Sequence, residues 1–295
     1  MAGTGLRSPI SRRGAGMTTY HRPGSLREAL ELRKQHPDYM VLAGGTDLLV
    51  AAHRKAEPPG IVDIFGLDDL CGVSEDGDGA VRIGAATTYA QILANDLANR
   101  ALPCLTAACR EIGALQIQAR GTIGGNLGTS SPVGDSLPPL LALGADIELA
   151  STDATRTVPY DQFCTGYRQT VLRPDELIAA VRIPPPPEGN VQYWRKVGPR
   201  RAQSISKVML AAVAALRDGT ITTARVAFGA VAATPIRAAA VERAMIGARP
   251  GPALASAVRA ALETEITPID DVRSTAKYRL DVAQNLIARF VLLLA

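Results

Sequence analysis

The sequence predicts an α+β protein made of two domains. Amphipathic helices and short strands follow one another without a regular strand–helix–strand repeat, which argues against a doubly wound sheet. Four consecutive prolines begin the segment 184–190, which is stiff and cannot continue a sheet. Farther on, Asp218-Gly219 lies between two apolar runs, a strong signal for a hairpin. We therefore expect domains at 17–183 and 191–295, joined by a linker at 184–190.

The first domain is expected to have two subdomains, at about 17–70 and 71–183. Its first helix begins at a capping box, in which Ser25 caps the helix and Glu28 reaches back, and it ends before Pro37. Further helices are predicted at 48–55, 87–98, 103–115 and 138–144. Strands are predicted at 39–43, 61–64, 81–85, 146–150, 156–158 and 177–183.

The second domain is expected to hold a three-stranded antiparallel sheet followed by helices. Thr234 and Pro235 match the N-cap and the first position of a helix. The strands are predicted at 192–197, 208–216 and 221–231, and the later helices at 252–263 and 275–294.

Two glycine-rich segments contain the candidate site. The first is Leu-Ala-Gly-Gly-Thr-Asp-Leu at 42–48, directly after a predicted strand, and the second is the loop-rich stretch 119–135, with four glycines between Gly121 and Gly128. Glycine lets backbone N–H groups approach an anion closely, although such a cluster can also be an ordinary long turn. Because there are two such segments, we expect them to hold the two phosphates of one dinucleotide.

Other phosphate-binding motifs are absent from the sequence. No Gly-Lys-[Ser/Thr] occurs, so a P-loop is excluded, and the spacing of Gly124, Gly125 and Gly128 differs from the Rossmann G-x-G-x-x-G. Neither glycine segment contains a lysine. We therefore expect backbone N–H groups and hydroxyls to hold a diphosphate that is bound but not transferred.

The composition disfavours several other classes of protein. The chain of 295 residues is 47% hydrophobic and only 4% aromatic, with a net charge of +4. Its basic residues are dispersed apart from the pairs at 195–196 and 200–201, so a nucleic-acid surface is not expected. No apolar run could span a bilayer. The Ser-Arg-Arg at 11–13 lacks the apolar stretch of a signal peptide, so residues 1–16 are expected to be a disordered extension, with Met17 as an alternative start to Met1.

The four cysteines form no C-x-x-C pair, and all three histidines lie within the first 53 residues. A zinc site or an iron–sulfur cluster on this chain is therefore not expected. We expect buried free thiols and a cytoplasmic protein. The cysteines are Cys71, Cys104, Cys109 and Cys164.

The glycine segments identify a resemblance to a known family. Leu-Ala-Gly-Gly-Thr-Asp-Leu at 42–48, Thr-Ile-Gly-Gly-Asn at 122–126 and Ser-Pro-Val-Gly-Asp at 131–135 resemble the FAD-binding (medium) subunits of the molybdenum hydroxylases. Residues 166–177 look like the xanthine dehydrogenase branch rather than the carbon monoxide branch, and 271–279 also match the family. The resemblance runs from Met17 to the C-terminus. It implies a two-subdomain FAD-binding domain of the vanillyl-alcohol-oxidase (PCMH) type, followed by a small C-terminal domain.

The resemblance also assigns site residues. The first loop would wrap the FAD pyrophosphate, and the second would complete the cradle, with Asp135 and Lys196 reaching the cofactor. Ile112 and Ile178 would pack on the flavin, and Tyr167 would lie on the face that nicotinamide approaches. From the residues alone, Asp135 could close an Asx turn, Lys196 could be a solvated strand residue, and Tyr167 and Ile112 could be core residues. The cofactor-binding set is Leu42, Ala43, Gly44, Gly45, Thr46, Asp47, Leu48, Ile112, Thr122, Gly124, Gly125, Asn126, Asp135, Ile178 and Lys196.

The implied function is that of an electron-transfer subunit. Non-covalent FAD would take electrons from the 2Fe-2S clusters of one partner subunit, and a molybdopterin-binding large subunit would complete a dimer of heterotrimers. NAD+ is the expected acceptor, although Gln203 stands where animal xanthine dehydrogenases carry acidic residues near the flavin. No catalytic side chain is required, since the flavin carries the chemistry.

Alternatives remain open from the sequence. Xanthine or hypoxanthine is the first expectation for the substrate of the complex, with nicotinate, aldehydes, aromatic acyl-CoA and carbon monoxide as others. The chain could also be a self-contained FAD oxidoreductase or a non-catalytic nucleotide-binding scaffold. Self-contained FAD oxidoreductases often attach their flavin covalently, and no histidine lies near the second glycine segment, so this alternative is less favoured.

Overall fold

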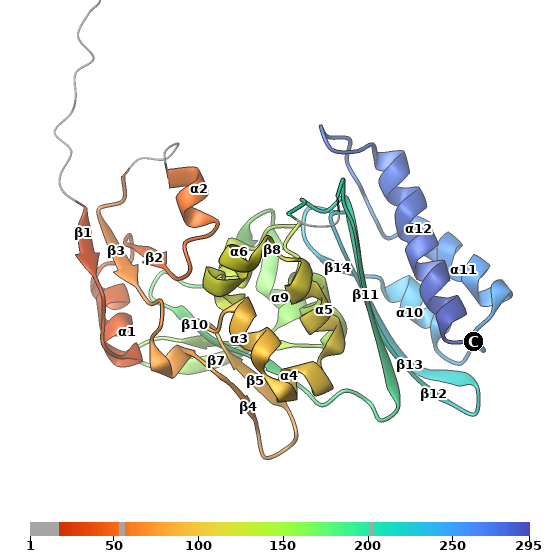
Figure 1. The fold of residues 1–295 in the computed structure, drawn as a ribbon, viewed down its shortest axis with the longest axis horizontal. Coiled ribbons are helices and arrows are strands. Elements are labelled where there is room, and N and C mark those ends of the chain that lie inside the picture. The colour runs from red at the N-terminus through yellow and green to blue at the C-terminus, as the bar shows by residue number, and fades with distance from the viewer. Residues whose placement is uncertain (1–17, 53–56, 201–202) are drawn as a thin grey trace, which may run out of the picture.

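Three sheets of three or more strands follow one another along the chain in the computed structural model, which describes residues 18–52, 57–200 and 203–295 (Figure 1). A small parallel sheet lies at one end, a five-stranded antiparallel sheet lies in the middle, and a four-stranded antiparallel sheet with a layer of helices lies at the other end. The predicted α+β class is confirmed. The N-terminal extension predicted at 1–16 lies outside the described residues.

The first sheet contains three parallel strands in the order β1-β3-β2. Helix α1 packs on it through Ala29 and Leu30, which are buried. Ser25 caps α1 as predicted, but the Glu28 carboxylate accepts from the N–H of Gly24 rather than of Ser25. The bounds are β1 (Thr19–His21), α1 (Leu26–Gln35), β2 (Met40–Leu42), α2 (Leu48–Ala52) and β3 (Gly60–Asp63).

The central sheet has the strand order β4-β5-β10-β6-β7, and its helices share a hydrophobic core with it. A two-stranded hairpin, β8–β9, follows the last helix of this region. The helices are η1 (Asp68–Leu70), α3 (Tyr89–Ala94), α4 (Asp96–Ala101), α5 (Pro103–Glu111), α6 (Leu115–Arg120), α7 (Ile123–Thr129), α8 (Leu137–Leu143) and α9 (Tyr160–Phe163). The strands are β4 (Val73–Glu75), β5 (Val81–Gly84), β6 (Asp146–Ala150), β7 (Thr155–Pro159), β8 (Cys164–Gly166), β9 (Gln169–Thr170) and β10 (Leu177–Ile183).

Three predictions in this region were wrong. The helix predicted at 103–115 ends at Glu111, because Ile112 is extended, and a separate helix begins at Leu115. The single helix predicted at 87–98 is two helices, because the Asn95 side chain accepts from the N–H of Ala98 and starts α4. The stretch expected to be loop-rich contains α7 and the end of α6. Thr122 caps α7 by accepting from the N–H of Gly125 at 3.0 Å, so hydroxyl capping outweighs the low helix propensity of glycine.

The C-terminal region begins after the four prolines, between β10 and β11. The predicted hairpin is confirmed, with φ of 51° at Asp218 and 72° at Gly219. The helix expected at Thr234 begins later, because residues 236 and 237 first add a short fourth strand to the sheet. The elements are β11 (Asn190–Val197), β12 (Val208–Arg217), β13 (Thr220–Gly229), β14 (Ile236–Arg237), α10 (Ala239–Met245), α11 (Pro252–Glu263) and α12 (Ala276–Leu293).

The four-stranded sheet is buried on both faces. Ala211 and Val213 of β12 belong to the core of the central region, whereas Leu210 and Ala212 belong to a second core with α10, α11 and α12. The strand therefore alternates between two cores, each side chain facing the opposite side from its neighbour. Figure 1 shows β11, β12 and β13 between the central helices and the C-terminal helices. None of the helices in the described residues is both long enough and apolar enough to cross a membrane.

Candidate functional site

A cavity of about 630 Å³ lies between the first loop, helix α7 and the start of β10. This volume is in the range of small-molecule and cofactor sites. Twelve of the fifteen predicted cofactor-binding residues line it, although they come from segments far apart in the sequence. They are Ala43, Gly44, Gly45, Thr46, Asp47, Leu48, Ile112, Thr122, Gly124, Gly125, Asn126 and Ile178.

The first loop, residues 43–48, presents free backbone donors to the cavity. The N–H groups of residues 44–48 donate no hydrogen bond to the described part of the chain. Gly45 has φ of 75°, a conformation that favours glycine. A Cβ on Gly44 would lie 1.8 Å from the carbonyl oxygen of Arg120, so glycine lets this loop touch the second glycine segment. Consecutive free N–H groups in such a loop form an anion-binding concavity.

The second segment is different, because its first amides already have partners. The N–H groups of Ile123 and Gly124 donate to the carbonyls of Thr87 and Ala85 at 3.2 and 2.9 Å, and that of Gly125 donates to Thr122 Oγ1. The backbone donors expected at Gly124 and Gly125 are therefore engaged within the protein. What these glycines provide is space.

The space that the two glycines provide is of two kinds. A Cβ on Gly124 would lie 2.6 Å from the Cβ of Ala85, so this glycine lets α7 pack against the residue after β5. A Cβ on Gly125 would meet one atom within 4 Å, Thr122 Oγ1 at 2.9 Å, and would otherwise point into open space. Gly124 therefore serves the packing of the fold, and Gly125 keeps part of the cavity clear.

Asp135 and Lys196 form a buried ion pair behind the cavity wall. Lys196 Nζ lies 2.6 Å from Asp135 Oδ2 and 3.4 Å from the carbonyl oxygen of Glu111, the residue before Ile112. Ser206 Oγ donates to Asp135 Oδ1 at 2.8 Å. Burial raises the pKa of Asp135, and Lys196 and Ser206 both act against that rise. The possibility that Lys196 is a solvated strand residue is thereby excluded.

Neither member of this ion pair lines the cavity, and the same is true of Leu42 and Tyr167. Leu42 ends β2, and its side chain lies 3.4 Å from the position of a Cβ on Gly45. Tyr167 lies at the tip of the β8–β9 hairpin and is 63% exposed, so it is not a core residue. Arg168, next to it, does line the cavity and was not predicted.

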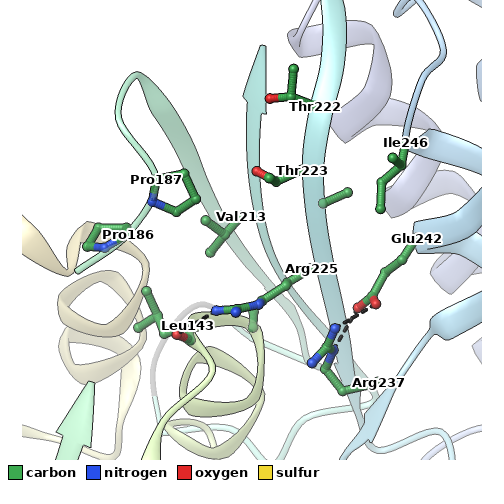
Figure 2. A pocket seen from close by; sticks show the side chains of 12 residues that line it. Leu143, Pro186, Pro187, Val213, Thr222, Thr223, Arg225, Arg237, Glu242 and Ile246 are labelled. Atoms are coloured by element: carbon green, nitrogen blue, oxygen red, sulfur yellow. Dashed lines mark hydrogen bonds and ion pairs between the residues drawn. The ribbon is translucent and has the colours of Figure 1, made fainter. Parts of the chain in front are cut away.

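A second cavity, of about 270 Å³, lies between α8 and the four-stranded sheet and contains none of the predicted residues (Figure 2). Its charged groups form hydrogen bonds or ion pairs within the protein. Arg237 forms a bidentate pair with Glu242 at 2.7 and 2.6 Å, and Glu242 also accepts from the N–H of Val226. Arg225 donates to the carbonyl of Leu143 at 3.2 Å. The contact of Arg225 joins the C-terminal region to the central region, whereas those of Glu242 lie within the C-terminal region. We do not assign a ligand to this cavity.

The cysteines and other potential metal ligands do not gather at one place. Cys104 and Cys109 are buried, and burial raises the pKa of the Cys104 thiol to about 12. In the described ranges, no three His, Cys, Asp or Glu side chains are grouped so that they could hold a metal ion.

The comparisons with known proteins agree with this geometry. Residues 15–186 match the family model of the FAD binding domain in molybdopterin dehydrogenase, and residues 193–294 match that of the CO dehydrogenase flavoprotein C-terminal domain. The chain is 33% identical to the xanthine dehydrogenase FAD-binding subunit of Escherichia coli O157:H7, covering 92% of this chain and 94% of that subunit. It is 34% identical to the carbon monoxide dehydrogenase medium chain of Afipia carboxidovorans, over 94% and 96% of the two chains.

Solved structures give the same result. The reconstituted CO dehydrogenase from Oligotropha carboxidovorans has a chain that superimposes with a TM-score of 0.88 and 30% identity, covering 93% of this chain and 96% of that one. Quinoline 2-oxidoreductase from Pseudomonas putida 86 has a chain with a TM-score of 0.87 and 25% identity, over 94% and 96%. The chain belongs to the FAD-binding subunits of the molybdenum hydroxylase family.

Proposed function

We propose that this chain binds FAD non-covalently and passes electrons from the 2Fe-2S clusters of a partner subunit to NAD+. The observation that carries the proposal is the loop 43–48, which lines a cavity of about 630 Å³ and whose N–H groups at residues 44–48 have no acceptor in the described chain. A diphosphate is the anion that such a row of donors suits, because its oxygens can accept from several consecutive N–H groups.

Three features of the cavity fit FAD. The free N–H groups of the first loop would hold the diphosphate, and the open space at Gly125 would admit it. Ile112 and Ile178 provide apolar surface for a flat ring system. No histidine or cysteine is among the described residues that line the cavity, which supports a non-covalent cofactor.

The ion pair between Asp135 and Lys196 does not line the cavity, so it would influence a bound cofactor through its charges rather than by direct contact. Lys196 donates to the carbonyl of Glu111, the residue before Ile112, so we propose that the buried pair lies near the end of the cofactor that Ile112 contacts. FAD, when bound, supplies exchange of single electrons and of hydride. Tyr167, at the exposed hairpin tip, would contact the nicotinamide and is the single side chain that we assign to that step.

The assembly is proposed from the family. A 2Fe-2S subunit and a molybdopterin-binding large subunit would complete a cytoplasmic dimer of heterotrimers. Xanthine or hypoxanthine is the substrate that we propose for this complex, on the strength of the motif at 166–177. The relatives include proteins named for carbon monoxide and nicotine as well as xanthine, so the same fold serves several substrates. We propose a domain division with a linker at 184–190; the first family model ends at residue 186 and the second begins at residue 193.

The test is an anaerobic visible absorption spectrum of the purified full chain, before and after addition of NADH. We expect a flavin spectrum that bleaches with NADH. A flavin spectrum that NADH leaves unchanged would support FAD binding but exclude direct electron exchange between NADH and the isolated chain. A chain that takes up no FAD on reconstitution would overturn the proposal.

A further inference from the structure

Arg168 lies at a backbone position that disfavours arginine. The β8–β9 hairpin pairs Gly166 with Gln169, so Tyr167 and Arg168 form a two-residue turn. Arg168 has φ of 55°, in the left-handed region that such a turn usually gives to glycine or asparagine. An ordinary side chain held in this conformation carries a cost, and such positions gather at functional sites.

The side chain of Arg168 reaches the first loop. Its Nη1 lies 3.5 Å from Asp47 Oδ2, which Thr129 Oγ1 also approaches at 3.4 Å, and both charged residues line the cavity. The side chains of Arg168 and Asp47 are 44% and 55% exposed. An exposed pair with this separation contributes little to the stability of a fold. The contact therefore calls for an explanation other than stability.

Charge at the first loop supplies that explanation. Asp47 places a carboxylate beside the row of N–H groups that we propose for a diphosphate, and two anions in one place repel each other. Arg33, the other cation in the described cavity wall, is buried and donates to the carbonyls of Tyr39 and Pro174. Arg168 makes one hydrogen bond to the described residues and has five N–H donors, so it retains donors for a ligand.

We propose that Arg168 is a cofactor-binding residue that neutralises Asp47 and donates charge-assisted hydrogen bonds to the diphosphate of the cofactor. The inference rests on the proposed function, because FAD is the ligand. It explains why arginine occupies a glycine-like turn position, since only a long cation from that tip reaches the loop. It also supplies a cation beside the first glycine segment, which contains neither lysine nor arginine.

The test measures the dissociation constant of FAD for the flavin-free full chain, by quenching of flavin fluorescence. Arg168→Gly removes the guanidinium but suits the left-handed turn, so it separates charge from backbone conformation. We expect it to weaken FAD binding about tenfold, the effect of one charged hydrogen bond, without lowering the melting temperature of the flavin-free chain. Arg168→Lys should retain most of the affinity. Lys34→Ala, which breaks the exposed Lys34–Asp153 pair outside the cavity, is the matched control and should leave binding unchanged.

Asp47 gives the second half of the test. Asp47→Asn alone should leave FAD binding unchanged or tighter, and combined with Arg168→Gly it should recover part of the lost affinity. The inference is overturned if Arg168→Gly binds FAD as the wild type does, or if Asp47→Asn alone weakens binding as much as Arg168→Gly. In both cases the wild type still binds FAD, and the proposed function stands. A wild type that takes up no FAD overturns both.

Discussion

The two glycine segments look alike in sequence and differ in the structure. Each contains Gly-Gly, and each includes or leads to an aspartate in an ion pair. In the first, residues 44–48 keep their N–H groups free, and Asp47 is half-exposed at 3.5 Å from Arg168. In the second, the amides of residues 123–125 have partners, and Asp135 is buried at 2.6 Å from Lys196.

The difference shows that glycine is required for two physical reasons. In the first loop it allows a left-handed conformation and leaves donors available to a ligand. In the second it removes side-chain volume so that a helix can pack on the neighbouring strand end. The first segment would therefore donate hydrogen bonds to the ligand, whereas in the second Gly124 allows helix packing and Gly125 keeps the cavity open. Four variants test this division, in order of expected effect.

Lys196→Met should have the largest effect, because it leaves Asp135 buried without its cation. We expect the free energy of unfolding to fall by about 3–5 kcal/mol at neutral pH. Chemical denaturation of the flavin-free chain measures this loss. Lys34→Met, at an exposed ion pair, is the control and should cost no more than about 1 kcal/mol.

The loss of stability in Lys196→Met should depend on pH. Burial raises the pKa of Asp135, and loss of Lys196 raises it further. A carboxyl group whose folded pKa is above its unfolded value favours folding at low pH, and this contribution is lost as pH rises through the folded pKa. The deficit relative to wild type should therefore shrink on acidification. A deficit that grows as pH falls would contradict the assignment.

Gly125→Val should abolish FAD binding, a loss of at least about a hundredfold or roughly 2.7 kcal/mol. The branched side chain of valine would occupy open space in the cavity that glycine, which has no side chain, leaves free. Circular dichroism should show a folded chain, and flavin absorbance after gel filtration reports binding. Gly77→Val, at a glycine that also faces open space but does not line the cavity, should keep its flavin. Full flavin occupancy in Gly125→Val would remove this residue from the site.

Gly124→Ala should instead destabilise the fold, by about 1–3 kcal/mol. The added methyl group would lie 2.6 Å from the Cβ and 2.7 Å from the carbonyl oxygen of Ala85, so α7 must move away from the end of β5. Thermal unfolding of the flavin-free chain measures the change. If Gly124→Ala instead left stability intact and weakened only FAD binding, both glycines would belong to the binding surface.

Tyr167→Ala should have the smallest effect on FAD binding, within about twofold or roughly 0.5 kcal/mol, because the side chain is exposed and does not line the cavity. Reduction of the bound flavin by NADH should be impaired more than binding. Stopped-flow absorbance with NADH, alongside the FAD dissociation constant, separates the two quantities. Equal losses in both would indicate a structural role for the hairpin tip.

Local chemistry explains which elements could be predicted from the sequence. The hairpin at Asp218-Gly219 needs two residues with positive φ, and the helix Pro252–Glu263 begins with proline and has clear periodicity, so both were predicted with the observed bounds or nearly so. Helix α7 was missed because glycine is a poor helix former, and the contact that selects the helix, with Ala85, is distant in sequence. The short strand β14 carries no periodic signal of its own.

The candidate site shows the same limit. The glycine motifs identified residues that line the cavity, because close approach of a ligand or of another segment to the backbone requires glycine at those positions. Neither Ser206 nor Arg168 belongs to a motif that indicates its role. Ser206 reaches Asp135 across 71 positions, and Arg168 reaches Asp47 across 121. Pairings of this kind depend on the fold, so composition and spacing do not reveal them.

The pairing of Asp135 has a consequence for synthesis. Both groups that satisfy its carboxylate, Lys196 and Ser206, belong to the C-terminal region and leave the ribosome after it. The last helix contacts the same segment, because Arg279 of α12 donates to the carbonyl of Lys207, next to Ser206. A nascent chain that ends before these segments carries an unpaired carboxylate behind its cofactor cavity. Pairing of this carboxylate therefore requires synthesis of the segment that contains Lys196 and Ser206.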